Sequence, residues 1–450
     1  MSVDASSLPT EPSEEAAHAA ASQAVVGPAS QAAGAALTDP AVRARYARGI
    51  TRALFVSQSL GTAGSIAATT VAAIVGAELS GRDSLAGLPS AVVQIGVAVG
   101  AYFWSRRSDK MGRRGALVAA LLTGMVGATM SLFAVASGNF PLVLIALFIT
   151  GSGNSAVQLG RFVAAEVNPR ARRARALSSV VFGGTIGSVV GPALVGPTGR
   201  LVEGWGWSEI AGPYLATGVG YLLTAVLLFL ALRPEPRLIG EAIAFDEGTV
   251  VRKDSARSLR QLLSDTAVRT AVASVVLAHM VMVGLMQMTS LHMHQHAHSL
   301  ANISFVFSSH TLGMYAFSTV AGWMTDKWGR RRVLGIGAII IIAACLLAPL
   351  SPHLLPVAFA LFLLGLGWNF CYVAGSALLT DALTPAEKGR MQGFNDLLVG
   401  GAAASATIIG GLIMANAGYL AMGLAGAAVS APLLFIVARL PRPTAGAALD

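Results

Sequence analysis

Twelve apolar runs divide most of this 450-residue chain, and each is close to the length of about 20 residues that a helix needs to cross a bilayer. Only 12% of the residues are charged, against about 25% in soluble domains. The sequence therefore predicts an all-α membrane protein with twelve transmembrane helices. The expected spans are residues 53–77, 86–105, 115–136, 140–164, 177–197, 210–232, 268–291, 301–324, 333–350, 354–380, 393–415 and 418–438.

A short basic loop occurs twice, after the second and the eighth of these runs. Residues 105–114 read SRRSDKMGRR, and residues 322–332 read GWMTDKWGRRR. Asp109 and Asp326 are separated by 326 − 109 = 217 residues, close to half of the chain, so we expect two pseudo-symmetric six-helix bundles. Gly329 permits a tight turn and Gly322 a close backbone approach, while Asp326 can neutralise the neighbouring bases.

The loop pattern G-x-x-x-D-K-x-G-R-R resembles the signature of the major facilitator superfamily, where it joins helices 2 and 3 and recurs between helices 8 and 9. Ser105 stands in place of the leading glycine of the first copy. The resemblance implies two bundles that rock about a midplane cavity and expose it to each side of the membrane in turn. It also implies that Asp109 and Asp326 are latches of the cytoplasmic side. In its closed state they would meet the starts of helices 11 and 5, near Gln392 and Gly393 and near Leu177 and Ser178 respectively.

An acid is also expected at the cytoplasmic end of the fourth helix of each half. These acids are Glu166 and Asp381, and both should lie near a basic loop. We predict ion pairs of Glu166 with Arg113 and of Asp381 with Arg330, which in the family fasten the inner face. Arg161, close to Glu166 in the same helix, is expected to pair with it too.

The basic residues determine the expected topology. With both termini in the cytoplasm, the external loops hold only Arg82 and Arg200 of the 31 Lys and Arg residues, as the positive-inside rule requires. This distribution favours a multi-pass protein of the cytoplasmic membrane over a nucleic-acid-binding protein. The expected parts are a disordered tail (1–38), an N-terminal bundle (39–232), a cytoplasmic linker (233–267), a C-terminal bundle (268–440) and a second tail (441–450). Residues 255–265 of the linker suggest an interfacial helix or a plain linker helix.

Glycine recurs at every fourth residue in the fifth span. Gly183, Gly187 and Gly191 form a smooth stripe against which another helix can pack closely, and Pro192 adds a bend point. The stripe resembles the G-x-x-x-G-P signature of superfamily members that act as antiporters, commonly drug/proton exporters. The match is partial, because Ser178 and Val195 replace two of that signature's glycines. Generic packing of small residues is the alternative.

Helices 1, 4, 7 and 10 line the cavity in the family, and their polar and aromatic residues are the substrate candidates. The set is Gln58, Asn154, Gln158, Gln287, Asn369 and Tyr372. Few charges accompany them, so the expected cavity is mostly apolar with hydrogen-bonding points. Such a cavity suits lipophilic or weakly polar compounds.

Proton coupling needs an ionisable group inside the membrane, and the acids of this chain lie near span ends. His279 and His310 remain at mid-span, and imidazole titrates near neutrality, so we predict that they carry the proton. Ordinary buried histidines are the alternative. The run of His292, His294, His296 and His298 beside several methionines allows a metal site, but a wet external loop is favoured.

Three functions are consistent with the sequence. The first is proton-coupled efflux of drug-like molecules by a secondary active transporter, and the second is import of a nutrient such as a carboxylate or a sugar. The third, less favoured, is metal-linked transport. We expect no enzyme activity, because no nucleophile, base and orienting group fall on adjacent spans. We also expect no cofactor and no bound metal, since a helix would scatter the histidine rings of the run at 292–298 around its axis and no Cys or carboxylate joins them. The expected partners are a small-molecule substrate, protons and the lipid bilayer, and the protein should be a monomer without nucleic acid.

Overall fold

The computed structural model describes residues 37, 39–246 and 257–439, and within them the chain is helical without strands. The tails predicted at 1–38 and 441–450 lie outside these residues except for Leu37. The long helices are α3 (Pro40–Ser80), α4 (Leu88–Ala136), α5 (Phe140–Glu166), α6 (Arg170–Glu203), α7 (Gly212–Ala231), α10 (Thr266–Gln295), α11 (Leu300–Tyr315), α12 (Ser318–Trp328), α13 (Arg330–Leu347), α14 (Leu354–Asp381) and α15 (Pro385–Ala438). Short elements are η1 (Asp83–Leu85), η2 (Glu209–Ala211), α8 (Pro236–Asp246), α9 (Leu259–Ser264) and η3 (Ala348–Leu350).

Local chemistry sets where these helices start and turn back. Asp39 caps α3 by accepting a hydrogen bond from the Ala41 amide, and Pro40 fills the first helical position. Gly112 (φ 78°) and Gly418 (φ 74°) reverse the chain within α4 and α15, so each of these elements is two spans joined by a tight turn. Gly329 (φ 86°) makes the corresponding turn between α12 and α13, as predicted for the second basic loop.

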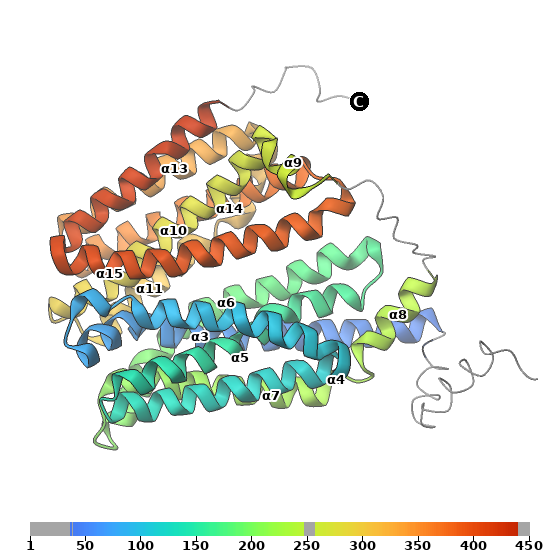
Figure 1. The fold of residues 1–450 in the computed structure, drawn as a ribbon, viewed down its shortest axis with the longest axis horizontal. Coiled ribbons are helices and arrows are strands. Elements are labelled where there is room, and N and C mark those ends of the chain that lie inside the picture. The colour runs from blue at the N-terminus through green and yellow to red at the C-terminus, as the bar shows by residue number, and fades with distance from the viewer. Residues whose placement is uncertain (1–36, 38, 247–256, 440–450) are drawn as a thin grey trace, which may run out of the picture.

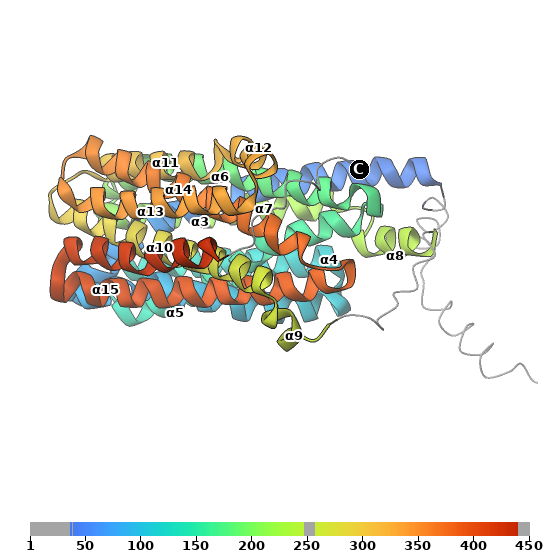
Figure 2. The same ribbon diagram turned by 90° about the horizontal axis from the view of Figure 1, so that it is seen from above.

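The helices form two bundles that meet at one end. In Figure 1, α3 to α7 form the lower half and α10 to α15 the upper half, and the two approach each other on the left and diverge on the right. Figure 2 shows the same helices running side by side along the long axis, with α8 beyond most of them. We call the end that carries η1, η2 and η3 the closed end, and the end that carries α8 and α9 the open end.

The described helices are consistent with the twelve predicted passes, with one local difference. Ten segments of the described chain are long and apolar enough to cross a membrane, and the last of them, Gly393–Ala438, folds back at Gly418 into two passes. The eighth predicted span, 301–324, is wrong as one continuous helix, because α11 ends at Tyr315 and α12 begins at Ser318. Phe317 leaves the helical region there (φ −100°, ψ 9°), and neither glycine nor proline marks the break.

The glycine stripe of α6 packs against α3. A Cβ atom added to Gly183, Gly187 or Gly191 would lie only 2.2–2.6 Å from a backbone oxygen of α3. The side chain of Ser59 in α3 also donates a hydrogen bond to the Gly183 carbonyl, at 2.8 Å. The absence of side chains on this face therefore lets two helix backbones touch, and Pro192 is accommodated inside α6.

The linker contains two helices, α8 on the N-terminal half and α9 on the C-terminal half, and only α9 was predicted. Helix α8 packs on the N-terminal half, where the Glu235 carboxylate just before it accepts the Arg113 and Arg114 amides that follow the turn at Gly112. In α9, Leu262 is fully buried within the C-terminal half. Leu259 and Leu263 pack partly buried beside it, so the apolar face of α9 contacts the C-terminal half. Whether α9 also lies at a membrane surface stays a prediction.

The Glu387 carboxylate fixes α9 to the start of α15. Its side chain has no exposed area, and it accepts hydrogen bonds from Arg257 Nε at 2.8 Å and from the Thr384 amide at 2.9 Å. The hydrogen bond from the Arg257 side chain, followed by those from Thr384, holds the pKa of Glu387 well below its usual range.

Glu387→Gln should therefore lower the Tm of the purified protein. A carboxyl group with a depressed pKa stabilises the fold above its unfolded value of about 4.3, and this contribution is lost only as the pH falls through the folded pKa. The difference in Tm between the two proteins should stay constant from pH 8 to about 5 and shrink in stronger acid. Glu241→Gln, which removes an exposed pair with Arg237, is the control and should change Tm little. Equal Tm values for Glu387→Gln and the wild type at pH 7 would contradict this prediction.

Candidate functional site

A central cavity of about 320 Å³ lies between the two halves. Residues of α3, α4, α5, α6 and α7 line it from the N-terminal half, and residues of α10, α11 and α15 from the C-terminal half. Both bundles therefore share one site, as the family resemblance predicts for a transporter with a midplane cavity.

Uncharged polar groups dominate the chemistry of this cavity. Its lining contains amides, hydroxyls and two histidines but no Asp, Glu, Lys or Arg among the described residues. The polar members are Ser65, Thr69, Ser90, Gln94, Thr150, Gln158, Ser188, Tyr214, Thr217, Tyr221, His279, Gln287, His310, Thr311, Tyr315 and Thr407. The cavity thus offers hydrogen bonds without a fixed charge.

Only two of the six predicted substrate residues line the cavity. Gln158 and Gln287 line the cavity. Asn154 does not line the cavity, but its side chain donates a hydrogen bond at 3.2 Å to Oγ of Ser65, which does.

The other three predicted residues are outside the cavity lining. Gln58 faces α6 and donates to Thr62 at 3.4 Å. Asn369 is buried and accepts from Ser318 at 3.4 Å, while its Nδ2 has no partner in the described part of the chain. Tyr372 is 39% exposed.

Sequence reasoning missed the residues of helices outside the four expected ones. Gln94 in α4, Tyr221 in α7 and Tyr315 in α11 all line the cavity. A glutamine in the middle of a predicted span was the available signal for Gln94, because an isolated amide is costly in lipid.

His310 has one ring nitrogen without a partner. Its Nδ1 lies 2.8 Å from the Leu361 carbonyl oxygen, which can only accept, so Nδ1 carries the hydrogen. In the neutral ring Nε2 is then an acceptor, and this buried atom has no hydrogen-bond partner among the described residues. A buried polar atom of this kind calls for an explanation. A proton or a substrate hydroxyl could occupy this position.

His279 is held by an aromatic neighbour. Trp368 Nε1 donates to His279 Nδ1 at 3.1 Å, so the neutral ring carries its hydrogen on Nε2. The Trp368 ring also stacks on Tyr372, with centroids 4.8 Å apart and an interplanar angle of 19°, and lies edge-on to Tyr315 at 6.3 Å. These residues form an aromatic cluster beside the cavity (His279, Tyr315, Trp368 and Tyr372).

The two halves are in close contact at the closed end. A Cβ atom on Gly87 would lie 1.6 Å from the Thr407 carbonyl oxygen, so the backbones of α4 and α15 touch there. Two polar pairs add to this contact: His294 Nε2 lies 2.6 Å from Glu78 Oε1, and Gln295 Nε2 donates to Asp83 at 2.8 Å. The cavity is therefore shut on this side.

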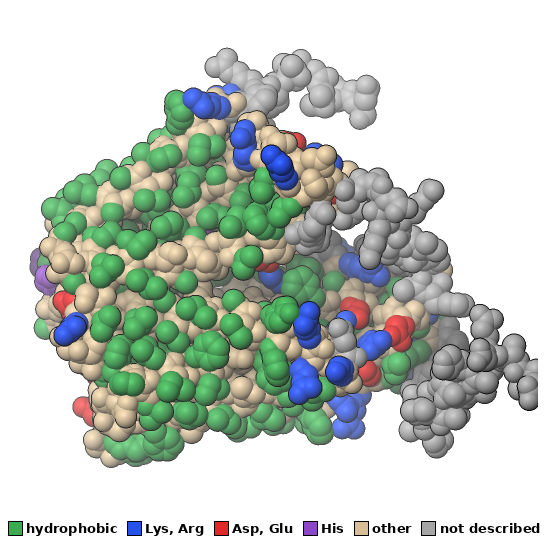
Figure 3. Space-filling view, viewed as in Figure 1, with side chains coloured by type: hydrophobic (Ala, Val, Ile, Leu, Met, Phe, Trp, Pro, Cys, Tyr) green, Lys and Arg blue, Asp and Glu red, His purple; other side chains and the backbone are tan. Residues whose placement is uncertain are grey.

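The halves are separated at the open end. Figure 3 shows a hollow between them, with Lys, Arg, Asp and Glu side chains gathered at this end and hydrophobic side chains over the flanks. The side chain of Asp326 is 79% exposed and lies 3.6 Å from Arg330 in the same loop, and Ser178 is exposed as well. The predicted contact of Asp326 with the start of α6 is therefore not made in this conformation. Gly322 also makes no close approach, contrary to expectation, because an added Cβ would meet nothing within 4 Å.

Both ion pairs predicted at this end are present. Arg113 Nε lies 2.9 Å from Glu166, and Arg330 Nε lies 3.0 Å from Asp381. Their role in transport stays a prediction. The side chains of Asp109 and Gln392 lie outside the described residues, so the first latch is not visible.

The prediction for Arg161 was wrong. Its Nη2 pairs with Asp396 of α15 at 3.0 Å and thus bridges the two halves. Residues five apart do not share a helix face, and both carboxylate oxygens of Glu166 already accept from Arg113.

The histidine run at the end of α10 does not gather around one point. His294 pairs with Glu78, His298 contacts the Pro352 carbonyl at 2.8 Å, and the His292 ring stacks on Tyr419 with centroids 4.1 Å apart. Within residues 39–246 and 257–439, no group of three or more His, Cys, Asp or Glu side chains could hold a metal ion.

Comparisons with known proteins give one family. The model of the Major Facilitator Superfamily matches residues 54–299 and 272–449. The chain is 31% identical to the uncharacterised MFS-type transporter YddS of Bacillus subtilis (strain 168) over 387 residues, 85% of this chain and 89% of that protein. It is 28% identical over 369 residues to the riboflavin transporter RfnT of Brucella anthropi, 81% of this chain and 89% of that protein. Its fold is similar to that of a D-xylose-proton symporter (TM-score 0.66, 17% identity, 88% of this chain and 98% of that chain).

Gly87→Ala should open the closed end, because the added methyl group cannot fit 1.6 Å from the Thr407 oxygen. A cysteine placed at Ser90, which is buried beside Gln287, should then react faster with a membrane-impermeant thiol reagent applied from that side. Gly400→Ala is the control, because an added Cβ there would meet nothing within 4 Å. Gel filtration checks that both variants fold. An unchanged labelling rate in a folded Gly87→Ala protein would contradict the contact.

Proposed function

The chain belongs to the Major Facilitator Superfamily, and we propose that it is a secondary active transporter that exports small, neutral organic molecules in exchange for protons. The observation that carries this proposal is the central cavity, whose described lining has hydrogen-bonding groups and histidines but no fixed charge. The glycine stripe of α6, which resembles the antiporter signature, favours export.

The aromatic cluster supports a substrate with a ring. Stacking on Tyr315, which lines the cavity with Trp368 edge-on beside it, would hold a flat molecule, while the amides of Gln94 and Gln287 would bind its polar edge. A carboxylate substrate is less well supported, because the cavity lining offers no cation and Arg161 is paired with Asp396.

Uptake of a riboflavin-like nutrient is the second candidate. Riboflavin is named in a relative that covers most of this chain, and a flat ring system with hydroxyl groups suits both the aromatic cluster and the uncharged polar lining. The direction of transport distinguishes the two candidates.

We further propose that the open end faces the cytoplasm. Its clusters of Lys and Arg obey the positive-inside rule in this orientation, and both chain termini then lie in the cytoplasm. The structure is then the inward-open state. The signature loops would act in the opposite state, in which Asp326 can reach the start of α6 and Asp109 the start of the eleventh span.

Tyr315→Leu should raise the KM for a neutral ring substrate several-fold, up to about tenfold, because an aromatic pair contributes about 0.5–1.5 kcal/mol beyond its buried area, and Tyr315 lines the cavity. Tyr315→Phe, which keeps the ring, should leave the KM close to that of the wild type. The assay measures uptake and efflux of riboflavin and of neutral aromatic drugs by proteoliposomes with an imposed pH gradient. No transport of any neutral compound in either direction, with transport of anions instead, would contradict the proposed function.

His310→Gln should abolish acceleration of transport by a pH gradient but preserve exchange of labelled for unlabelled substrate. The free Nε2 of His310 can take up a proton without breaking an existing hydrogen bond. His279→Gln should have the same kind of effect, because protonation of Nδ1 would displace Trp368. His353→Gln, at an exposed helix cap, is the control. Unchanged gradient dependence in both His279→Gln and His310→Gln would remove the histidines from the coupling mechanism.

Asp326→Asn should slow turnover at unchanged Tm. The side chain is exposed in this conformation, so folding does not depend on it, whereas the state with the cytoplasmic side closed would lose a stabilising contact. Single-turnover transport and thermal unfolding provide the two measurements, and a wild-type rate would refute the latch.

A further inference from the structure

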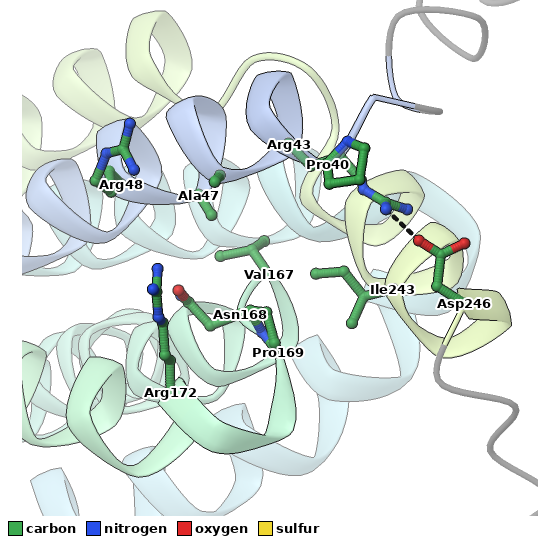
Figure 4. A pocket seen from close by; sticks show the side chains of 11 residues that line it. Pro40, Arg43, Ala47, Arg48, Val167, Asn168, Pro169, Arg172, Ile243 and Asp246 are labelled. Carbon is green, nitrogen blue, oxygen red and sulfur yellow. Dashed lines mark hydrogen bonds and ion pairs between the residues drawn. The ribbon is translucent and has the colours of Figure 1, made fainter.

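A second pocket, of about 240 Å³, lies at the open end of the N-terminal half, away from the central cavity. The first turns of α3, the turn between α5 and α6 and the end of α8 surround it, and Figure 4 shows these distant segments around one gap. The polar side chains of its lining are those of Arg43, Arg48, Asn168, Arg172 and Asp246.

The pocket carries an excess of positive charge. Arg43 is 7% exposed, pairs with Asp246 and donates to the Ala242 carbonyl at 3.2 Å, so its charge is compensated. Arg48 and Arg172 are exposed, and neither pairs with a carboxylate within residues 39–246 and 257–439. The pocket therefore has two guanidinium groups that no described carboxylate neutralises. In Figure 4 the Arg172 side chain points into the gap, and the exposed Arg48 side chain is directed away from it, so Arg48 would have to rotate to meet an anion there.

Asn168 adds an acceptor to these two donors. Its Nδ2 is engaged by Thr51 Oγ1 at 3.1 Å and by the Ala164 carbonyl at 2.8 Å, and Figure 4 shows its amide oxygen directed into the gap beside Arg172. Apolar side chains complete the wall, among them Ala47, Val167 and Ile243. An anion that also carries a hydroxyl group and a short carbon chain would satisfy all of these groups.

We propose that this pocket binds a phosphate ester, with Arg48 and Arg172 holding the phosphate oxygens and Asn168 accepting from a ligand hydroxyl. Two cations on different helices suit phosphate oxygens that point in several directions, whereas one guanidinium suffices for a planar carboxylate. The volume is below the 300–1,000 Å³ typical of drug-sized ligands and fits a head group.

The position of the pocket allows two sources for this chemistry. Helix α3 has 41 residues, about 60 Å, so its first turns extend past a hydrocarbon core of about 30 Å. Basic pockets between helices on the cytoplasmic side bind the head groups of anionic lipids. A glycerol phosphate group can therefore come from phosphatidylglycerol or from a free phosphate ester in the cytoplasm. The inference rests on the proposed orientation of the open end and not on the transported substrate.

The test measures Tm and bound lipid, by native mass spectrometry, for the purified full-length protein in detergent. Phosphatidylglycerol should raise the Tm of the wild type and phosphatidylcholine should not. R48Q/R172Q should lose most of this shift and bind phosphatidylglycerol on the order of tenfold more weakly. The control R45Q/R175Q removes two exposed arginines one turn away on the same helices and should keep the shift. Arg172→Gln alone is measured as well, in case the double variant does not fold.

A second measurement, with sn-glycerol 3-phosphate in place of the lipid, distinguishes a free phosphate ester from a lipid head group. A saturable Tm shift with this compound that R48Q/R172Q abolishes supports a free phosphate ester, and a shift with the lipid alone supports a head group. The proposal is overturned if neither ligand shifts the Tm, if folded R48Q/R172Q and Arg172→Gln respond like the wild type, or if R45Q/R175Q loses the response equally.

Discussion

The contact between backbones at the closed end is the constraint on which the rest of this structure depends. Gly87 brings α4 so close to the Thr407 carbonyl of α15 that no side chain fits between them, and Gly411 of α15 also lies near the backbone before α4. Such contact seals one end of the cavity without burying a charge. The halves can then diverge at the other end, where Arg161 and Asp396 are a bridging pair. Small residues are the means by which helices approach closely in lipid, where the hydrophobic effect does not drive them together.

Much of the fold could be predicted because its determinants are local. Apolar runs, the duplicated basic loop and the glycines at 112 and 329 indicated the spans, the two halves and the tight turns. The break between α11 and α12 could not be predicted, since no glycine or proline marks it and tertiary packing must impose it. Helix α8 was missed because it is short and because its position depends on contacts with Arg43 and Glu166, which are distant in sequence.

The candidate site was predicted less well than the fold, because it depends on contacts between residues that are distant in sequence. Gln158 and Gln287 lie in the cavity, but Gln58 and Asn369 have the same chemistry and lie outside it. Which face of a helix points inward depends on neighbours distant in sequence, such as Trp368, which fixes His279. The partner of Arg161 could not be read from spacing either, because Asp396 is 235 residues away. Phosphate binding at the second pocket is likewise inferred from segments that only the fold brings together.

The central claim is that the two ends of the cavity open in alternation about one shared site. Distances between paired spin labels test it most directly, with one pair at Ser179 and Lys327 on the open end and another at Arg82 and Ala297 on the closed end, all of them exposed positions. The account predicts two populations in proteoliposomes, one with a long first and a short second distance and one with the reverse, whose ratio shifts with the pH gradient. Two distances that lengthen and shorten together, or a single fixed population under all gradients, would contradict it.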